Sequence, residues 1–83
     1  MARYQYLINR RVLEVLDAAE EGERSRLLAA FDRLENHPEQ DCDFHERGDS
    51  GADIRCKFFG NWLVRYRVDS PVRQVVVVDC RWT

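Results

Sequence analysis

The sequence predicts an α+β fold, in which an N-terminal strand and a helical hairpin pack on one face of a mostly antiparallel sheet of four to five strands. Apolar residues recur with helical spacing in the N-terminal half, whereas the C-terminal half is rich in aromatic and β-branched residues. The 83 residues are 45% hydrophobic and 34% charged, which supplies enough apolar side chains for one core. We therefore expect a single domain over residues 1–83.

The opening residues predict a strand followed by a helix. Residues 3–8 carry tyrosine and isoleucine at alternate positions, a pattern typical of a strand. Asn9 then offers a side-chain oxygen that can cap a helix. Apolar residues spaced by three and four continue to Ala19, so we expect an amphipathic helix that Gly22 ends.

A second helix is predicted from about Glu23. Its apolar stripe consists of Leu27, Leu28, Phe31 and Leu34. His37 precedes Pro38, and a residue before proline is pushed out of the helical region, so the helix should end at Asn36. The connection around Gly22 is short, which predicts an antiparallel helical hairpin.

The C-terminal half is predicted to form strands separated by turns. Residues 39–43 suit a loop, 44–47 a short strand and 48–51 a turn, and a β-hairpin follows over 53–69. The four valines at 75–78 are apolar on both sides, which indicates an interior strand. We expect the N-terminal strand on its far side and residues 44–47 at the opposite edge of the sheet.

Two registers of the hairpin are compatible with its turn residues. A two-residue turn at 60–61 pairs Phe59 with Trp62 and mixes charged and hydrophobic side chains on each face. A three-residue loop at 59–61 pairs Phe58 with Trp62. It puts the hydrophobic side chains on one face and most of the charged side chains on the other, so we predict this loop. The residues that it turns toward the helices are Ile54, Cys56, Phe58, Trp62, Val64 and Tyr66.

The predicted register gathers five cations on the face of the sheet away from the helices. They are Arg55, Lys57, Arg65, Arg67 and Arg81. Regular alternation along the last strand adds Asp79, Val75 and Val77 to the face of Arg81. Arg55 would lie directly opposite Arg65, which needs a nearby anion or acid. Guanidinium groups fit phosphate with forked hydrogen bonds, so this face is either a phosphate groove or the solvated surface of a sheet.

Charge and chemistry narrow the candidate site residues. Residues 52–83 hold a net charge of +3 and residues 1–51 hold −5, so the C-terminal half is the candidate for an anionic partner. RNA cleavage without a metal needs a base for the 2′-hydroxyl proton and cations for the developing phosphorane charge. Arginine stays protonated and cannot be that base, which leaves Lys57, Asp79 and His45 as candidates.

Several classes of site and location are not predicted. The cysteines Cys42, Cys56 and Cys80 are odd in number and lack C-x-x-C spacing, so neither a disulfide framework nor a zinc site is expected. No Gly-rich phosphate loop or acidic metal-binding loop occurs, and we expect no metal and no other cofactor. No window approaches the roughly 18 apolar residues of a membrane span, and the first residues lack a secretory signal. We therefore expect a cytoplasmic protein without membrane contact.

Three segments carry a further signal, namely residues 34–38 at the end of the second helix, 60–69 in the hairpin and 75–81 in the last strand. In order and spacing they resemble the RelE/ParE superfamily of toxins from bacterial toxin–antitoxin pairs, and the resemblance spans nearly the whole chain. It implies a RelE/ParE-like fold, an antitoxin protein as partner, and a groove that enters the ribosome and cleaves mRNA. Matching to the family carries over Arg55, Lys57 and Arg81, and Arg65 lies on the same predicted face two residues beyond the family position. We take these four as the candidate catalytic residues, and the same four with Arg67 of the predicted basic face as the candidate RNA-binding residues.

The resemblance also leaves a second activity open. The ParE branch of the superfamily inhibits DNA gyrase without cleaving RNA. Leu63 stands where the family often has arginine, and the sequence stops at Thr83, before the tail that often holds a catalytic histidine or tyrosine. The pI of 5.6 is low for a protein that docks on ribosomal RNA. These features favour a non-catalytic or degenerate member that acts by binding gyrase or an antitoxin.

Overall fold

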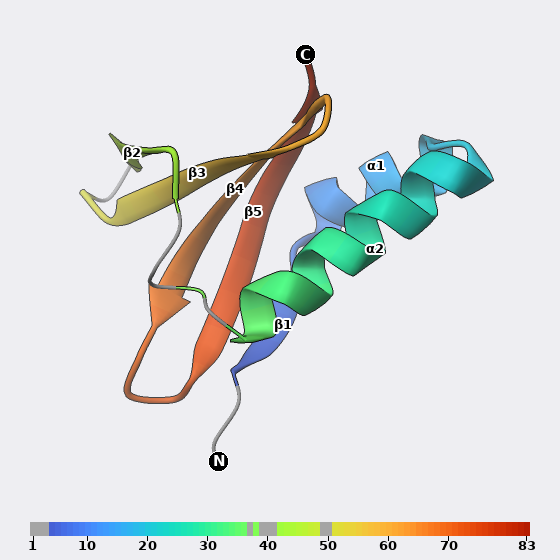
Figure 1. Cartoon of the computed structure of the whole chain (residues 1–83). Coiled ribbons are helices and arrows are strands. Elements are labelled where there is room, and N and C mark those ends of the chain that lie inside the picture. Colours follow the sequence, from blue (N-terminus) through green and yellow to red (C-terminus); the bar gives the residue numbers. More distant parts are fainter. Residues whose placement is uncertain (1–3, 37, 39–41, 49–50) are drawn as a thin grey trace.

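The computed structural model describes residues 4–36, 38, 42–48 and 51–83. They form a helical hairpin packed against a five-stranded sheet (Figure 1). In chain order the elements are β1 (Gln5–Ile8), α1 (Arg10–Ala18), α2 (Glu21–Asn36), β2 (Phe44–Arg47), β3 (Asp53–Phe59), β4 (Trp62–Asp69) and β5 (Gln74–Trp82). The predicted α+β class is confirmed. No helix in the described part of the chain is long and apolar enough to cross a bilayer.

The start of α1 is fixed by the predicted cap. The Asn9 side-chain oxygen accepts a hydrogen bond from the backbone N–H of Val12 at 3.0 Å. The Asn9 side-chain nitrogen donates to the Val78 carbonyl of β5 at 2.8 Å. One side chain therefore satisfies a free N–H of the first helical turn and also ties that turn to the sheet.

The prediction that Gly22 ends the first helix is wrong. α1 stops before Ala19, whose backbone is extended, and the Arg24 guanidinium donates to the carbonyls of Leu16 at 2.8 Å and Ala19 at 3.0 Å. The Leu16 carbonyl also accepts from the Ala19 N–H at 3.3 Å, and the bond to Ala19 satisfies a carbonyl that follows the last helical residue. Gly22 instead lies in the first turn of α2, beside Glu21, whose negative charge suits a helix N-terminus.

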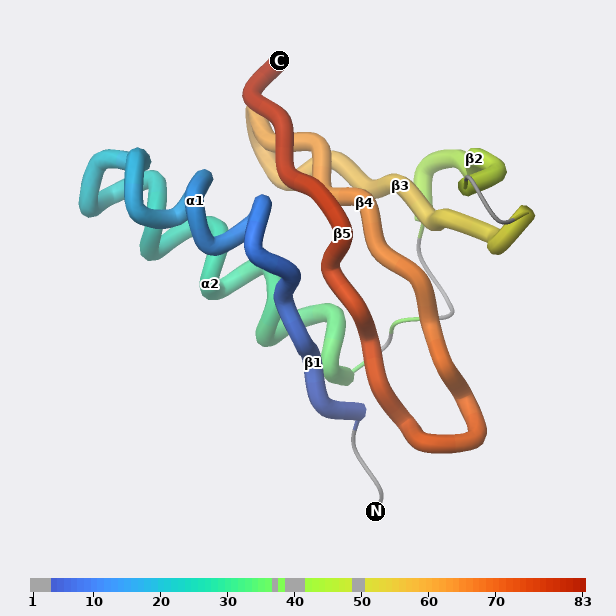
Figure 2. Tube along the Cα trace, turned by 180° about the vertical axis from the view of Figure 1, so that it is seen from behind, coloured from blue at the N-terminus to red at the C-terminus, as the bar shows by residue number. Residues whose placement is uncertain are grey.

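The sheet has the strand order β1-β5-β4-β3-β2. β1 runs parallel to β5, and every other neighbouring pair is antiparallel. The parallel pair arises because the chain leaves β1 through the helical hairpin and returns to that strand's side only at the end, as the trace in Figure 2 shows. The predicted neighbours of the last strand and the edge position of residues 44–47 are both confirmed.

The predicted three-residue loop in the hairpin is wrong. Phe59 pairs with Trp62, and Cys56 pairs with Arg65, which is the register of a two-residue turn at 60–61. Gly60 holds the left-handed position with φ 61°, as the first central residue of a type II′ turn does.

The position of the helices explains why this register is stable. The helices contact β1 and β5 most closely, and β3 extends beyond them (Figure 1). The helix-side face of β3 can therefore carry Arg55 and Lys57, and the opposite face buries Ile54 and Cys56. Charged and hydrophobic side chains must be sorted onto opposite faces of a strand only where helices cover one of those faces.

An irregularity in β5 changes which residues share a face. Arg65 pairs with Asp79 and the next residue, Tyr66, pairs with Val77, so Val78 is an extra residue in β5. Such a bulge shifts the alternation by one position. The prediction that Val75 and Val77 share a face with Asp79 and Arg81 is therefore wrong, because the two valines lie in the core on the helix side.

The core lies between the helices and the strands β1, β5 and β4. Its buried members are Val12, Leu16, Leu27, Phe31, Leu34, Trp62, Val64, Tyr66, Val75, Val77 and Cys80. Trp62 is anchored across the layers, because its indole N–H donates to the Glu23 carboxylate of α2 at 2.8 Å. The Tyr66 hydroxyl donates to the Pro38 carbonyl at 3.3 Å, which places the end of α2 over β4.

Candidate functional site

The face of the sheet away from the helices, called the outer face below, carries the densest group of interacting charges in the described residues. Residues paired across neighbouring strands lie on the same face. Phe44 pairs with Cys56, Cys56 with Arg65, and Arg65 with Asp79. These four residues therefore form one row that crosses β2, β3, β4 and β5.

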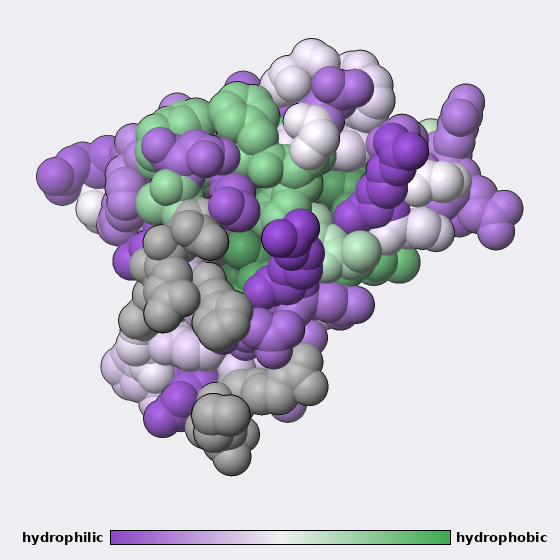
Figure 3. Space-filling model, viewed as in Figure 1, coloured by the Kyte–Doolittle hydropathy of each residue, from purple (hydrophilic) through white to green (hydrophobic). Residues whose placement is uncertain are grey.

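The adjacent row is mostly hydrophobic and ends in an arginine. Phe58 pairs with Leu63, and Leu63 pairs with Arg81. The rings of Phe44 and Phe58 lie 6.2 Å apart between centroids, and these residues are 39% and 45% exposed. Figure 3 views the molecule from the side of α2, as Figure 1 does, and on that side too hydrophobic surface lies beside strongly hydrophilic side chains. The outer face thus joins an apolar patch to a charged row.

Two arginines and two carboxylates form the charged part of this face. Arg65 Nε donates to Glu46 Oε1 at 2.8 Å, and another guanidinium nitrogen of Arg65 lies 3.6 Å from Asp79 Oδ2. The same Asp79 oxygen accepts from Arg81 Nε at 2.8 Å. Asp79 is only 5% exposed, whereas the Arg81 side chain is 63% exposed. Asp79 therefore fixes the Nε end of the Arg81 guanidinium group, while most of the Arg81 side chain is exposed to solvent.

Cys56 completes this network as a neutral thiol. Its Sγ donates to Glu46 Oε1 at 3.3 Å. Burial, and then the Glu46 carboxylate, raise the pKa of Cys56 to about 11. Conversely, the hydrogen bond from Cys56 and then that from Arg65 lower the pKa of Glu46. At neutral pH Cys56 is therefore an uncharged thiol, and Glu46, whose pKa is lowered, is a carboxylate.

The structure brings together only some of the predicted site residues. Arg65 and Arg81 lie on the outer face, and Arg67 joins them because it follows Arg65 at the next alternate position of β4. Arg55 and Lys57 lie on the opposite face, where they pair with Tyr66 and Val64 of the core side. The predicted convergence of five cations, and the opposition of Arg55 to Arg65, are therefore wrong. The catalytic and RNA-binding roles of these residues stay predictions.

The three candidate bases lie on two faces of the sheet, with Asp79 on the outer face and Lys57 and His45 on the helix side. Asp79 accepts its ion pairs from both outer-face arginines. Lys57 Nζ lies 5.8 Å from the centre of the Phe59 ring, on the helix side. His45 pairs with Arg55 and so shares that side of the sheet. The outer face can bind an anion through Arg81 and stabilise negative charge, but the described acid–base groups near Arg65 are two paired carboxylates and the neutral thiol of Cys56.

Glu46 is the member of this network that sequence reasoning missed. It lies on the edge strand β2, where all four residues are exposed. Its face follows from its pairing with Ile54, which puts it beside Phe44 and across from Arg65. The alternation of Phe44 and Glu46 was a usable signal, but it identifies the outer face only once the register of β3 is known.

No metal or disulfide contributes to the geometry described above. Among the residues that the structure describes, no group of three His, Cys, Asp or Glu side chains is arranged to hold a metal ion. Cys42, Cys56 and Cys80 are free thiols.

Comparison with solved structures identifies the fold. The chain superposes on RelE in the crystal structure of the archaeal RelE–RelB complex from Pyrococcus horikoshii OT3, with a TM-score of 0.76 and 21% sequence identity. The match covers 95% of this chain and 93% of the other. This chain has the RelE fold. The resemblance predicted from the sequence is thus confirmed for the fold, and the RelE fold of this chain has a mixed sheet. No protein-family model matches the sequence, and no curated protein matches it at a significant level.

Proposed function

We propose that this protein is the toxin of a toxin–antitoxin pair and that a small antitoxin protein binds and neutralises it. The observation that carries the proposal is the RelE fold, which extends over 95% of the chain and matches a protein solved as a RelE–RelB complex. Within the proposal, the protein acts in the cytoplasm, where both candidate targets, the ribosome and DNA gyrase, are found.

Growth of cells that express the chain tests this role. The chain alone should arrest growth, and co-expression of the protein encoded by an adjacent gene should restore it. Normal growth with the chain alone, at a protein level verified by immunoblot, would contradict the proposal.

The first candidate action is ribosome-dependent cleavage of mRNA. The exposed guanidinium of Arg81, oriented by Asp79, is suited to hold a phosphate, and Arg65 and Arg67 add positive charge to the same face. Arg55 and Lys57 would contribute only if the RNA also reached the helix-side face of β3, where they lie. In this candidate action, Glu46 or Asp79 would have to release an arginine before it could take a proton.

The second candidate action is binding of a protein target, such as gyrase, without cleavage. Two observations favour it. Arg65 is already paired with Glu46 and Asp79, so its charge is largely compensated within the protein. Phe44 and Phe58 expose aromatic surface next to this network, and interfaces between proteins are enriched in aromatic residues.

Translation extracts programmed with a defined mRNA separate the two actions. If cleavage is the action, the protein should cut the mRNA and Arg81→Ala should remove at least about 99% of that activity, as expected when a charge-stabilising donor is lost. Arg26→Ala is the matched control, because Arg26 is an exposed arginine on α2 with a surface ion pair to Glu23. Intact mRNA together with inhibited gyrase supercoiling would instead support protein binding.

A further inference from the structure

Three chemically reactive side chains lie in a line outside the outer-face network. His45 Nδ1 is 2.9 Å and 3.1 Å from the two carboxylate oxygens of Asp53. On the other side of the same ring, His45 Nε2 is 3.0 Å from the Cys42 sulfur. Catalytic thiols are activated by this arrangement: the nucleophile lies within hydrogen-bond distance of a base, and a third group orients that base.

The protonation pattern of the three groups follows from hydrogen bonding. The Asp53 carboxylate can only accept, so the proton of a neutral His45 ring lies on Nδ1. Nε2 then presents its lone pair to Cys42, whose thiol is the donor. His45 is therefore oriented to receive the proton of Cys42 when the sulfur forms a new bond.

Cys42 is held in place by the residue that follows it. The Asp43 backbone N–H donates to the Cys56 carbonyl at 2.8 Å. The Asp43 carboxylate accepts from the backbone N–H of Phe58 at 2.7 Å. Both bonds anchor the chain next to Cys42 on β3, the same strand that carries Asp53. The alignment of the three side chains thus rests on backbone pairing and not on the side chains alone.

The three cysteines differ in their access to reagents. Cys56 and Cys80 are buried, and burial raises the pKa of these thiols to about 11 and about 12. Cys42 is half-buried, and the side chains of His45 and Asp53 are 50% and 59% exposed. Because a thiol must ionise and be reached in order to react, Cys42 is the reactive cysteine of the three.

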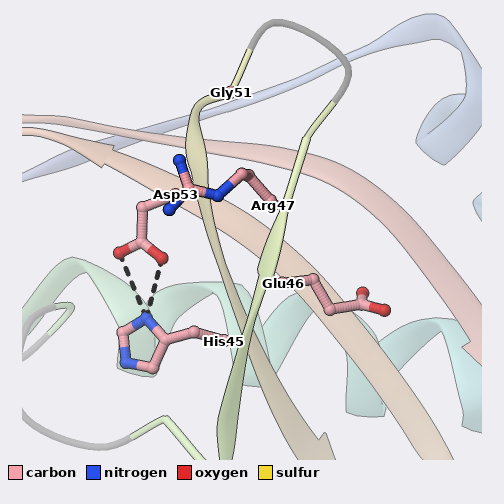
Figure 4. Close-up of a pocket in the computed structure, with 5 residues that line it drawn as sticks. All are labelled: His45, Glu46, Arg47, Gly51 and Asp53. Atoms are coloured by element: carbon pink, nitrogen blue, oxygen red, sulfur yellow. Dashed lines mark hydrogen bonds and ion pairs between the residues drawn. The ribbon is translucent and has the colours of Figure 1, made fainter.

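A pocket adjoins the base and its orienting carboxylate. It has a volume of about 340 Å³ and is lined by His45, Glu46, Arg47, Gly51 and Asp53. Figure 4 shows both carboxylate oxygens of Asp53 directed at the His45 ring and Arg47 beside Asp53. Arg47 gives the pocket a guanidinium for a carboxylate of a small ligand.

We propose that Cys42 is a modification site, at which His45 and Asp53 promote thiol–disulfide exchange with a small anionic disulfide such as glutathione disulfide. The Cys42 sulfur bonds to one glutathione sulfur while the disulfide bond of the reagent breaks. The proton of Cys42 passes to His45 Nε2 and then to the departing glutathione thiolate. Cys42 is oxidised to the mixed disulfide, the departing sulfur is reduced, and excess reduced glutathione reverses the step.

The test measures the rate of adduct formation on the full chain by intact-protein mass spectrometry, with glutathione disulfide as the reagent at neutral pH. We expect one glutathionyl group, located on Cys42 by peptide mapping and absent from Cys42→Ser. His45→Gln should slow the reaction by about tenfold or more, at the lower end of the effect of a positioned base. Asp53→Asn should slow it less, because the ring keeps its nitrogen but loses its fixed orientation.

Matched controls separate this mechanism from simple exposure of the thiol. Arg47→Gln should slow the reaction with glutathione disulfide but leave the rate with the uncharged 2-hydroxyethyl disulfide unchanged. Circular dichroism of each variant should match that of the parent chain, because all four substituted side chains are exposed or half-buried. The proposal is overturned if His45→Gln and Asp53→Asn, both folded, react as fast as the parent chain, or if the adduct forms on Cys56 or Cys80.

Discussion

At the scale of single residues, Asp79 decides what the outer face can do. It is the one buried charged residue in the described part of the chain, and it contacts both Arg65 and Arg81. Burial of a carboxylate destabilises a fold unless groups of opposite charge contact it. Asp79 also weakens anion binding at Arg65, because an approaching anion competes with the Asp79 carboxylate for the guanidinium group.

Removal of the Asp79 charge should therefore destabilise the fold. Asp79→Asn keeps the side-chain shape but replaces two charge-assisted contacts, and we expect the free energy of unfolding to fall by about 1–3 kcal/mol. Urea denaturation measures the difference. Asp32→Asn, an exposed position on α2, is the matched control and should change stability by less than about 0.5 kcal/mol. Equal effects at the two positions would show that the buried network does not contribute to stability.

At the scale of elements, the β3–β4 hairpin sets the register on which the outer face depends. Its two-residue turn puts Phe59 against the core and leaves Phe58 exposed next to Phe44. A change to a three-residue loop would exchange these two phenylalanines and move Arg55 and Lys57 to the outer face. The neighbouring phenylalanines therefore report the register directly.

Alanine substitutions at these two positions test the register. Phe59→Ala should lower the free energy of unfolding by about 2–3 kcal/mol, less than for a fully buried phenylalanine because Phe59 is half-buried. Phe58→Ala removes only an exposed ring and should cost under about 1 kcal/mol. The reverse order in thermal or urea denaturation would support the three-residue loop.

Two glycines provide a second test of local structure. Gly60 has φ 61° with no neighbouring atom within 4 Å of an added Cβ, so Gly60→Ala should cost about 1–2 kcal/mol from backbone strain alone. Gly22 also has open space around an added Cβ, but it lies in the first turn of α2. Gly22→Ala should therefore stabilise the chain by about 0.5 kcal/mol. A gain of stability at Gly60 would contradict the type II′ turn.

At the scale of the whole molecule, the cations divide between two faces of one sheet. Arg65, Arg67 and Arg81 lie on the outer face, whereas Arg55 and Lys57 lie on the side of the helices. A single strand of RNA that binds the outer face meets only the first group. The division limits how many phosphates the protein can neutralise at one time.

The salt dependence of RNA binding measures that number. If RNA binds the outer face, the log–log slope of affinity against salt should be about −2, from about 0.7 for each of the three contacts, rather than the −3.5 or so for all five cations. Arg67→Ala should make the slope shallower by about 0.7, and Lys57→Ala is the matched control with no change. A steeper slope, reduced by both variants, would mean that the RNA contacts both faces.

Local patterns in the sequence were sufficient to predict the helices, the capping role of Asn9 and the neighbours of the last strand. Helical periodicity and turn residues are local signals, so they can be interpreted without knowledge of the rest of the fold. The hairpin register and the bulge at Val78 are not local, because they depend on how far the helices cover the sheet. The pairing of Arg65 with Glu46 follows from that register and was missed with it.

The placement of β5 has a consequence for synthesis of the chain. β5 follows every other element in sequence, yet in the sheet it lies between β1 and β4. As the polypeptide leaves the ribosome, β1 therefore has no strand to pair with until residues 74–82 emerge, and the core lacks Val75 and Val77 until then. Because such contacts join distant parts of the chain, they form late and slowly. The outer-face charge network needs Asp79 and Arg81 of β5. It therefore cannot form in the nascent chain before these two residues have been added.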